Sequence, residues 1–152
     1  HAKVNGHYVN SMMALREAQL SGFDEALMLD HQGFIAEGSG ENFFMIKDGE
    51  VFTPPPQAIL CGITRDTIIQ LCRDMNIPIH EVSITRDMAY LADEAFFTGT
   101  AAEVTPIREI DFRMIGKGER GPITQKLQEA YFKVVGGQNA NYRHWLTQGV
   151  TA

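Results

Sequence analysis

Two carboxylates flank a glycine-rich turn in the first third of the chain. Glu37 and Glu41 stand on either side of the Gly-Ser-Gly segment at 38–40, and the chain then continues into apolar residues at 43–46. Glycines free the backbone, so acids beside them can approach a ligand closely. A solvated hairpin turn is the alternative interpretation of this stretch, and the choice between them depends on the rest of the chain.

An anion site is a second candidate, at the start of a predicted helix. Gly62, Ile63 and Thr64 precede an amphipathic segment, and backbone amides, the helix dipole and a hydroxyl at such a point suit a phosphate. An ordinary threonine cap is the alternative. Farther along, a predicted strand runs into Gly-Thr-Ala-Ala at 99–102. That segment would expose amides and hydroxyls at a strand end, where ligands often bind, although a packed turn has the same composition.

Lys3 is the candidate nucleophile. A lysine just ahead of a predicted helix is usually solvated, and only burial or a neighbouring charge would activate it. The five histidines have no i, i+4 pairing and no acidic or cysteine partners at ligand spacing, so metal catalysis is not expected. The sequence also contains no nucleophile elbow, Walker motif or dinucleotide-binding glycine pattern. We therefore expect neither a serine hydrolase nor a nucleotide-binding protein.

Length and composition indicate one globular domain with a real core. The chain has 152 residues, of which 44% are hydrophobic and 21% charged. Its formal charge of −6 argues against nucleic-acid binding, and no apolar run approaches the roughly 18 residues of a membrane helix. Cys61 and Cys72 are too few for a disulfide scaffold, so a cytoplasmic location is expected, with Cys72 packed in the core. Because the chain opens on His1 rather than Met, we expect it to be part of a longer protein.

Helical and strand patterns alternate along the chain. The spacing of apolar residues and the turn signals predict helices at 8–20, 65–75, 85–91, 122–135 and 141–148. They predict strands at 25–30, 34–36, 43–46, 51–53, 78–82, 94–98 and 103–110, with a weak hairpin closing at 114–118. Apolar residues at positions 9, 12, 13 and 20 mark one face of the first helix. Because hairpins and helices are intermixed, we predict a mixed α/β (α+β) domain rather than a regular doubly wound sheet.

Together these segments resemble the large C-terminal domain of a fold-type IV pyridoxal-phosphate enzyme, specifically a branched-chain-amino-acid aminotransferase. The resemblance rests on AKVNGHY at 2–8, EGSGENFF at 37–44, GITRD at 62–66, FTGTAAEVTPI at 97–107 and GPIT at 121–124. It covers essentially the whole chain and implies a sheet or pseudo-barrel with flanking helices. It also implies that the family's small N-terminal domain, which precedes the lysine, is absent from this chain.

The resemblance implies roles around the ring of the cofactor, pyridoxal 5′-phosphate. Lys3 would form the Schiff base with the cofactor aldehyde and later move a proton to and from the substrate. Tyr8 would contact the phenolic oxygen of the cofactor. Glu37 would lie at the pyridine nitrogen and keep it protonated, whereas Glu41 and Asn42 would shape the turn.

The resemblance also implies which residues bind two anionic groups, the cofactor phosphate and the substrate carboxylate. Ile63, Thr64 and Thr100 would hold the cofactor phosphate, and the amides of Thr100 and Ala101 would bind the substrate carboxylate. The implied reaction is transamination of L-leucine, L-isoleucine or L-valine with 2-oxoglutarate, which yields 2-oxo acids and glutamate. The implied assembly is a homo-oligomer, a dimer or larger, with no nucleic-acid or membrane partner.

Two alternatives stay open. A sister enzyme of the same fold, a D-amino-acid aminotransferase or an aminodeoxychorismate lyase, would use the same cofactor site. A non-catalytic fragment that folds and self-associates would use none of it. We expect the isolated chain to be inactive, because in the family the N-terminal domain supplies another phosphate-binding arginine and part of the pocket wall.

Overall fold

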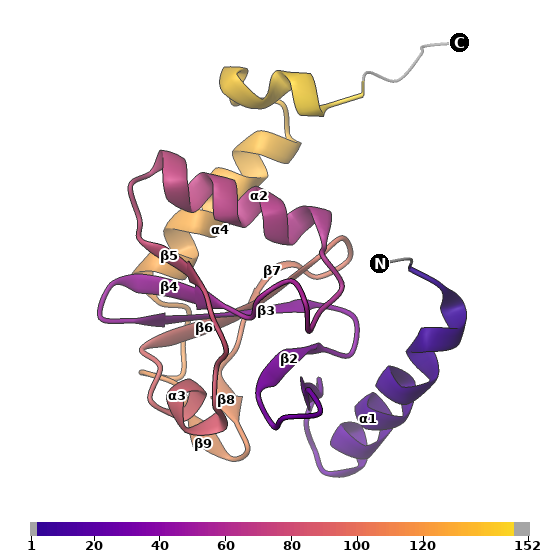
Figure 1. Cartoon of the computed structure of the whole chain (residues 1–152). Helices are drawn as coiled ribbons and strands as arrows, with labels where there is room; N and C mark the ends of the chain where they lie inside the picture. Colours follow the sequence, from indigo (N-terminus) through magenta and orange to yellow (C-terminus); the bar gives the residue numbers. More distant parts are fainter. Residues whose placement is uncertain (1–2, 148–152) are drawn as a thin grey trace.

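Seven strands form one mixed sheet in the computed structural model, which describes residues 3–147 (Figure 1). These strands are β1 (Leu27–Leu29), β2 (Ile35–Gly38), β3 (Asn42–Lys47), β4 (Glu50–Thr53), β5 (Ile79–Glu81), β6 (Glu94–Gly99) and β7 (Glu103–Pro106). β3 lies between β4 and β6 and is antiparallel to both, whereas β5 joins β4 in parallel. β7 pairs with β6 at one edge, and β2 connects β1 to β3.

Helices surround the sheet, and some of them cover its faces. They are η1 (Asn5–His7), α1 (Tyr8–Leu20), α2 (Ile63–Asp74), α3 (Arg86–Tyr90), α4 (Pro122–Val135) and η2 (Ala140–Trp145), where η denotes a 3-10 helix. Helices α2 and α4 pack on each other and on one face of the sheet, while α3 and the β8–β9 hairpin (Glu109–Ile110 and Arg113–Met114) lie at the other face (Figure 1). Helices and mostly antiparallel strands in one domain confirm the predicted mixed α/β fold. None of the helices in the described part of the chain is long and apolar enough to cross a membrane.

The central strand β3 is apolar on both sides because both of its faces are covered. Phe44 points toward α2 and α4, where it stacks on Phe96 with ring centroids 4.9 Å apart, and Phe43 points into the opposite layer beside Phe97. Successive side chains of a strand alternate between faces, so a strand buried on both sides has a continuous apolar sequence. This explains the run at 43–46.

A buried carboxylate joins the sheet to α4. Glu94, the first residue of β6, accepts hydrogen bonds from the backbone amides of Ile123 and Thr124 at 3.0 and 2.7 Å. These amides belong to the first turn of α4, where the backbone N–H groups have no hydrogen-bond acceptor within the helix. Gly121 precedes the helix because a Cβ there would lie 2.1 Å from Cδ of Glu94. The carboxylate thereby fixes where α4 begins.

Three expectations from the sequence were wrong in detail. The predicted strand at 103–110 is two strands, because the chain leaves β6 at Pro106 and pairs again as β8 with β9. That hairpin turns at Asp111 and Phe112, both with positive φ, rather than closing at 114–118. The expected helix at 141–148 is the 3-10 helix η2, and position 148 lies outside the described residues.

The first helix has the predicted bounds but does not bury the predicted face. The apolar side chains predicted to share this face are between 60% and 73% exposed, namely Val9, Met12, Met13 and Leu20. Figure 1 shows the reason, since α1 lies beside the sheet rather than over either face. Within the described residues, α1 contributes no buried side chain to the core.

Candidate active site

A cavity of about 620 Å³ lies where four distant segments of the chain meet. Its walls come from the region before and at the start of α1, the β2–β3 turn, the loop leading into α2, and the end of β6. The predicted site residues that line it are Lys3, Tyr8, Glu37, Ile63, Thr64 and Thr100. Ala101 lies exposed next to Thr100 and is not part of the lining. The structure therefore brings all of the predicted site residues except Ala101 together in one cavity. Their individual roles stay predictions.

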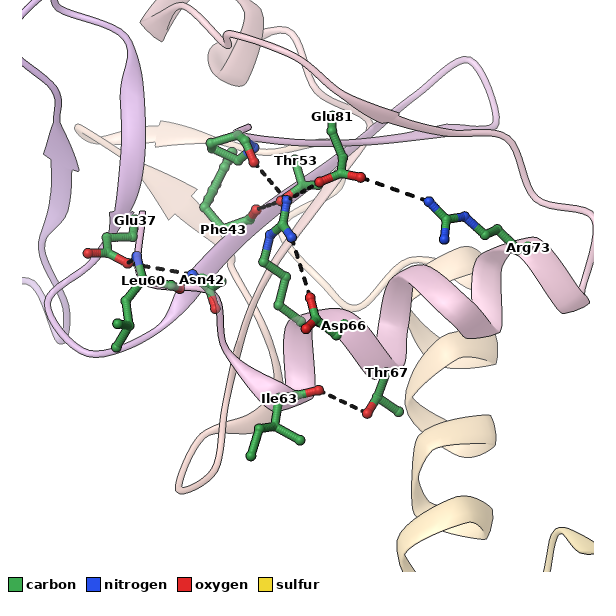
Figure 2. Close-up of polar contacts among 12 residues, drawn as sticks. Glu37, Asn42, Phe43, Thr53, Leu60, Ile63, Asp66, Thr67, Arg73 and Glu81 are labelled. Atoms are coloured by element: carbon green, nitrogen blue, oxygen red, sulfur yellow. Dashed lines mark hydrogen bonds and ion pairs between the residues drawn. The ribbon is translucent and has the colours of Figure 1, made fainter. Parts of the chain in front are cut away.

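Glu37 forms a half-buried acidic wall of the cavity. One of its oxygens, Oε2, accepts a hydrogen bond from the backbone amide of Leu60 at 3.0 Å and a longer one from Nδ2 of Asn42 at 3.5 Å (Figure 2). Burial raises the pKa of Glu37, although the Leu60 amide and the charge of Lys3 act in the opposite direction. A carboxylate held in this way would be stabilised as an anion by a cationic partner in the cavity.

The start of α2 presents backbone amides without a side-chain cap. Gly62 is the N-cap residue, and no side chain from the described residues accepts from the first amides of the helix. The alternative interpretation of Thr64 as an ordinary cap is therefore wrong. Thr64 is buried, whereas the side chain of Ile63 is 84% exposed. Uncapped amides at a helix N-terminus, with the helix dipole behind them, suit an anion.

One amide side chain joins the acidic wall to this helix start. Nδ2 of Asn42 donates to Glu37 and also to the backbone carbonyl of Leu60, the latter at 2.8 Å. Its Oδ1 lies so close to Gly62 that a Cβ there would be only 2.4 Å away. From the sequence we predicted that Asn42 shapes the turn. That prediction did not include its contacts with Glu37 on one side of the cavity and Gly62 on the other.

A buried arginine orients α2. Nη2 of Arg65 donates to the backbone carbonyl of Pro54 at 2.9 Å and to Glu81 at 2.8 Å, and its side chain is only 3% exposed. These bonds connect the loop after β4 and the end of β5 to the first turn of the helix. Sequence reasoning missed this residue, because its helical position resembles an exposed one. A basic residue directly after the anion motif was the available signal.

Other cavity residues carry polar groups that the sequence did not single out as site residues. Gln57 and Cys61 line it from the loop before α2, and Thr98 lines it from β6. Cys61 is exposed, whereas Cys72 is buried and its pKa is raised to about 12 by desolvation, which confirms the predicted packing role of Cys72. Within residues 3–147, no group of three or more metal-ligating side chains is close enough to hold an ion.

Comparison with known proteins identifies the class. The family described as amino-transferase class IV matches residues 1–110, so the chain belongs to that family. It is 59% identical over 146 residues to the branched-chain-amino-acid aminotransferase of Pseudomonas aeruginosa, covering 96% of this chain and 48% of that protein. It is 44% identical to the Escherichia coli K12 enzyme of the same name, covering 97% of this chain and 48% of that protein.

Solved structures agree with this assignment. The branched-chain amino acid aminotransferase of Thermobaculum terrenum, in its pyridoxal-phosphate (PLP) form, superimposes with a TM-score of 0.93 at 44% identity, covering 95% of this chain and 48% of that one. The enzyme of Thermoproteus uzoniensis with norvaline gives a TM-score of 0.92 at 53% identity, covering 96% of this chain and 48% of that one. These likenesses confirm the predicted fold-type IV architecture. The chain spans about half the length of the relatives that it matches.

Proposed function

We propose that the chain is the large C-terminal domain of a branched-chain-amino-acid aminotransferase. Such an enzyme would transfer the amino group of L-leucine, L-isoleucine or L-valine to 2-oxoglutarate with pyridoxal 5′-phosphate as cofactor. The observation that carries the proposal is the meeting of Lys3, Glu37 and the uncapped start of α2 in one cavity. The names of the relatives and the PLP form of the Thermobaculum terrenum structure support it.

The residues of the cavity fit this cofactor. When bound, pyridoxal 5′-phosphate supplies an aldehyde and a ring that withdraws electrons from the substrate carbon. Lys3 would hold the aldehyde and, once released, carry a proton to and from that carbon. Glu37 would keep a proton on the ring nitrogen, and the resulting cation would lower the raised pKa of this carboxyl. Tyr8 would contact the phenolic oxygen.

Two anionic groups would be bound at the start of α2 and just after β6. The amides of Ile63 and Thr64 at the start of α2, with the hydroxyls of Thr64 and Thr100, would hold the cofactor phosphate. The amides of Thr100 and Ala101, just after β6, would bind the substrate carboxylate.

The remaining parts of the proposal concern the whole enzyme. We infer a small N-terminal domain ahead of Lys3, a homo-oligomeric assembly and a cytoplasmic location. The chain alone would then have negligible activity, because it spans only about half the length of its relatives. A panel of branched-chain L-amino acids, D-amino acids and aminodeoxychorismate, given to the full-length enzyme, separates the proposed activity from its sister activities.

The cofactor assignment is tested with the full-length protein. After incubation with pyridoxal 5′-phosphate and reduction with borohydride, mass spectrometry should find the cofactor on the peptide that contains Lys3. Lys3→Ala should lose this attachment. Lys47→Ala is the matched control, since Lys47 forms a surface ion pair with Asp93 at 3.0 Å and does not line the cavity. Attachment that persists in Lys3→Ala, or none in the wild type, would refute the proposal.

A further inference from the structure

Thr98 has a buried hydroxyl without a partner in the wall of the cavity. Among the side chains of residues 3–147, the buried polar atoms that lack a hydrogen-bond partner are Arg65 Nε, Thr98 Oγ1 and Thr124 Oγ1. Only Thr98 of these three lines the cavity, and it is 1% exposed. A hydroxyl buried without a partner destabilises the protein, because it has lost its hydrogen bonds to water without replacing them. A ligand that entered the cavity could supply the missing partner.

The sheet fixes where this hydroxyl points. Thr98 is paired on one side with Asn42 of β3 and on the other with Val104 of β7, so its backbone is held by two strands. Side chains alternate along a strand, which places Thr98 on the same face as Phe96. Phe96 belongs to the core layer beneath α2 and α4. Thr98 therefore faces the α2 side of the sheet.

Asn42 shows how near the start of α2 lies. It is the direct cross-strand neighbour of Thr98, and its Oδ1 contacts the backbone at Gly62. Thr98, Gly62 and Thr64 all line the same cavity. The hydroxyl thus lies in the corner of the cavity where the uncapped amides of α2 gather. Amides only donate hydrogen bonds, so the group that fits this corner is an acceptor with several oxygens.

We propose that the Thr98 hydroxyl donates a hydrogen bond to the phosphate ester of the cofactor. This inference rests on the proposed function and adds a binding residue to the phosphate group already assigned to Ile63, Thr64 and Thr100. Its charge-assisted bond is of the stronger kind, because the acceptor is an anion. Thr98 would therefore discriminate pyridoxal 5′-phosphate from pyridoxal, which has the same ring and aldehyde but no phosphate.

The test compares two ligands and two matched variants in the cofactor-free, full-length enzyme. Thr98→Val keeps the shape of the side chain and removes the hydroxyl. It should weaken binding of pyridoxal 5′-phosphate about tenfold or more, measured by equilibrium titration, and leave binding of pyridoxal unchanged. Thr124→Val removes the other buried unpartnered hydroxyl, in α4, and should change neither affinity. Thr98→Ser restores the hydroxyl and should recover most of the affinity.

The outcomes separate this inference from the function on which it rests. If Thr98→Val binds pyridoxal 5′-phosphate as the wild type does, or loses affinity for both ligands equally, the hydroxyl does not serve the phosphate. If the wild type binds neither ligand, the proposed function is refuted and the inference with it. Circular dichroism of each ligand-free variant checks folding. If Thr98→Val fails to fold, the comparison of Thr98→Ala with Thr98→Ser distinguishes the same outcomes.

Discussion

Gly62→Ala should disturb the connection between the acidic wall and α2. The φ and ψ of Gly62, −83° and 143°, suit alanine as well as glycine, so the effect is steric. The new Cβ would lie 2.4 Å from Oδ1 of Asn42, about 1 Å inside ordinary contact. Asn42 is 5% exposed, and its displacement would break the 2.8 Å bond to Leu60 and leave a buried amide unsatisfied. We expect a loss of about 2–3 kcal/mol in the free energy of unfolding.

Urea unfolding of the chain measures this loss. The only tryptophan, Trp145, provides a fluorescence signal, and coincidence with far-UV circular dichroism checks two-state behaviour. The melting temperature should fall by roughly 4–12 °C. Gly40→Ala is the matched control, because its Cβ would meet nothing within 4 Å.

A double mutant tests the cause of the loss. Asn42→Ala removes the atom with which the new Cβ would collide, so Gly62→Ala should cost little in that background. The coupling free energy between the two changes should be about 1–2 kcal/mol. Additive losses in the double mutant, or a Gly62→Ala chain within about 0.5 kcal/mol of the wild type, would refute the reasoning.

Two further predictions concern buried carboxylates. Because burial raises the pKa of Glu37, the folded protein binds the proton of this carboxyl more tightly than the unfolded chain does. The folded protein therefore loses stability as the pH rises from about 4.5 through the raised pKa. Glu37→Gln should therefore stabilise the ligand-free chain more at pH 8 than at pH 4, whereas the exposed Glu17→Gln should show no such trend in thermal melts. Glu94→Ala should cost about 2–3 kcal/mol in urea unfolding, because two amides of α4 lose their acceptor. The exposed Glu119→Ala should cost under about 0.5 kcal/mol, and equal losses would contradict the capping role of Glu94.

Local patterns were sufficient to predict much of the fold. The helices at 8–20 and 122–135 have the predicted bounds, since apolar spacing, a proline in the first turn and following glycines all act within one segment. Thr85 begins the predicted helix at 85–91 as the N-cap of α3, and its side chain accepts a hydrogen bond from the amide of Met88 at 3.4 Å. The segments of the site were likewise visible as motifs, because each is a short run of glycines, acids or hydroxyls.

What the sequence did not reveal depends on contacts between distant segments. Arg65 is buried only because Pro54 and Glu81 reach it from two other elements. The turn at Asp111 and Phe112 requires positive φ at both residues, and a bulky residue such as Phe112 seldom adopts it, so the pair did not predict a turn. The apolar face of α1 is the opposite case, because it is exposed although its spacing is that of a buried face. Helical spacing predicts which residues share a face but not whether another element covers that face.

The position of Asn42 has a consequence for how this enzyme family can vary. Because Asn42 contacts both Glu37 and Gly62 directly, the span between the carboxylate and the helix start is set across space rather than along the chain. The turn at 47–50, between β3 and β4, contributes no residue to the cavity lining. Insertions or deletions there should leave the span unchanged, so this turn can diverge in length while the cavity keeps its dimensions.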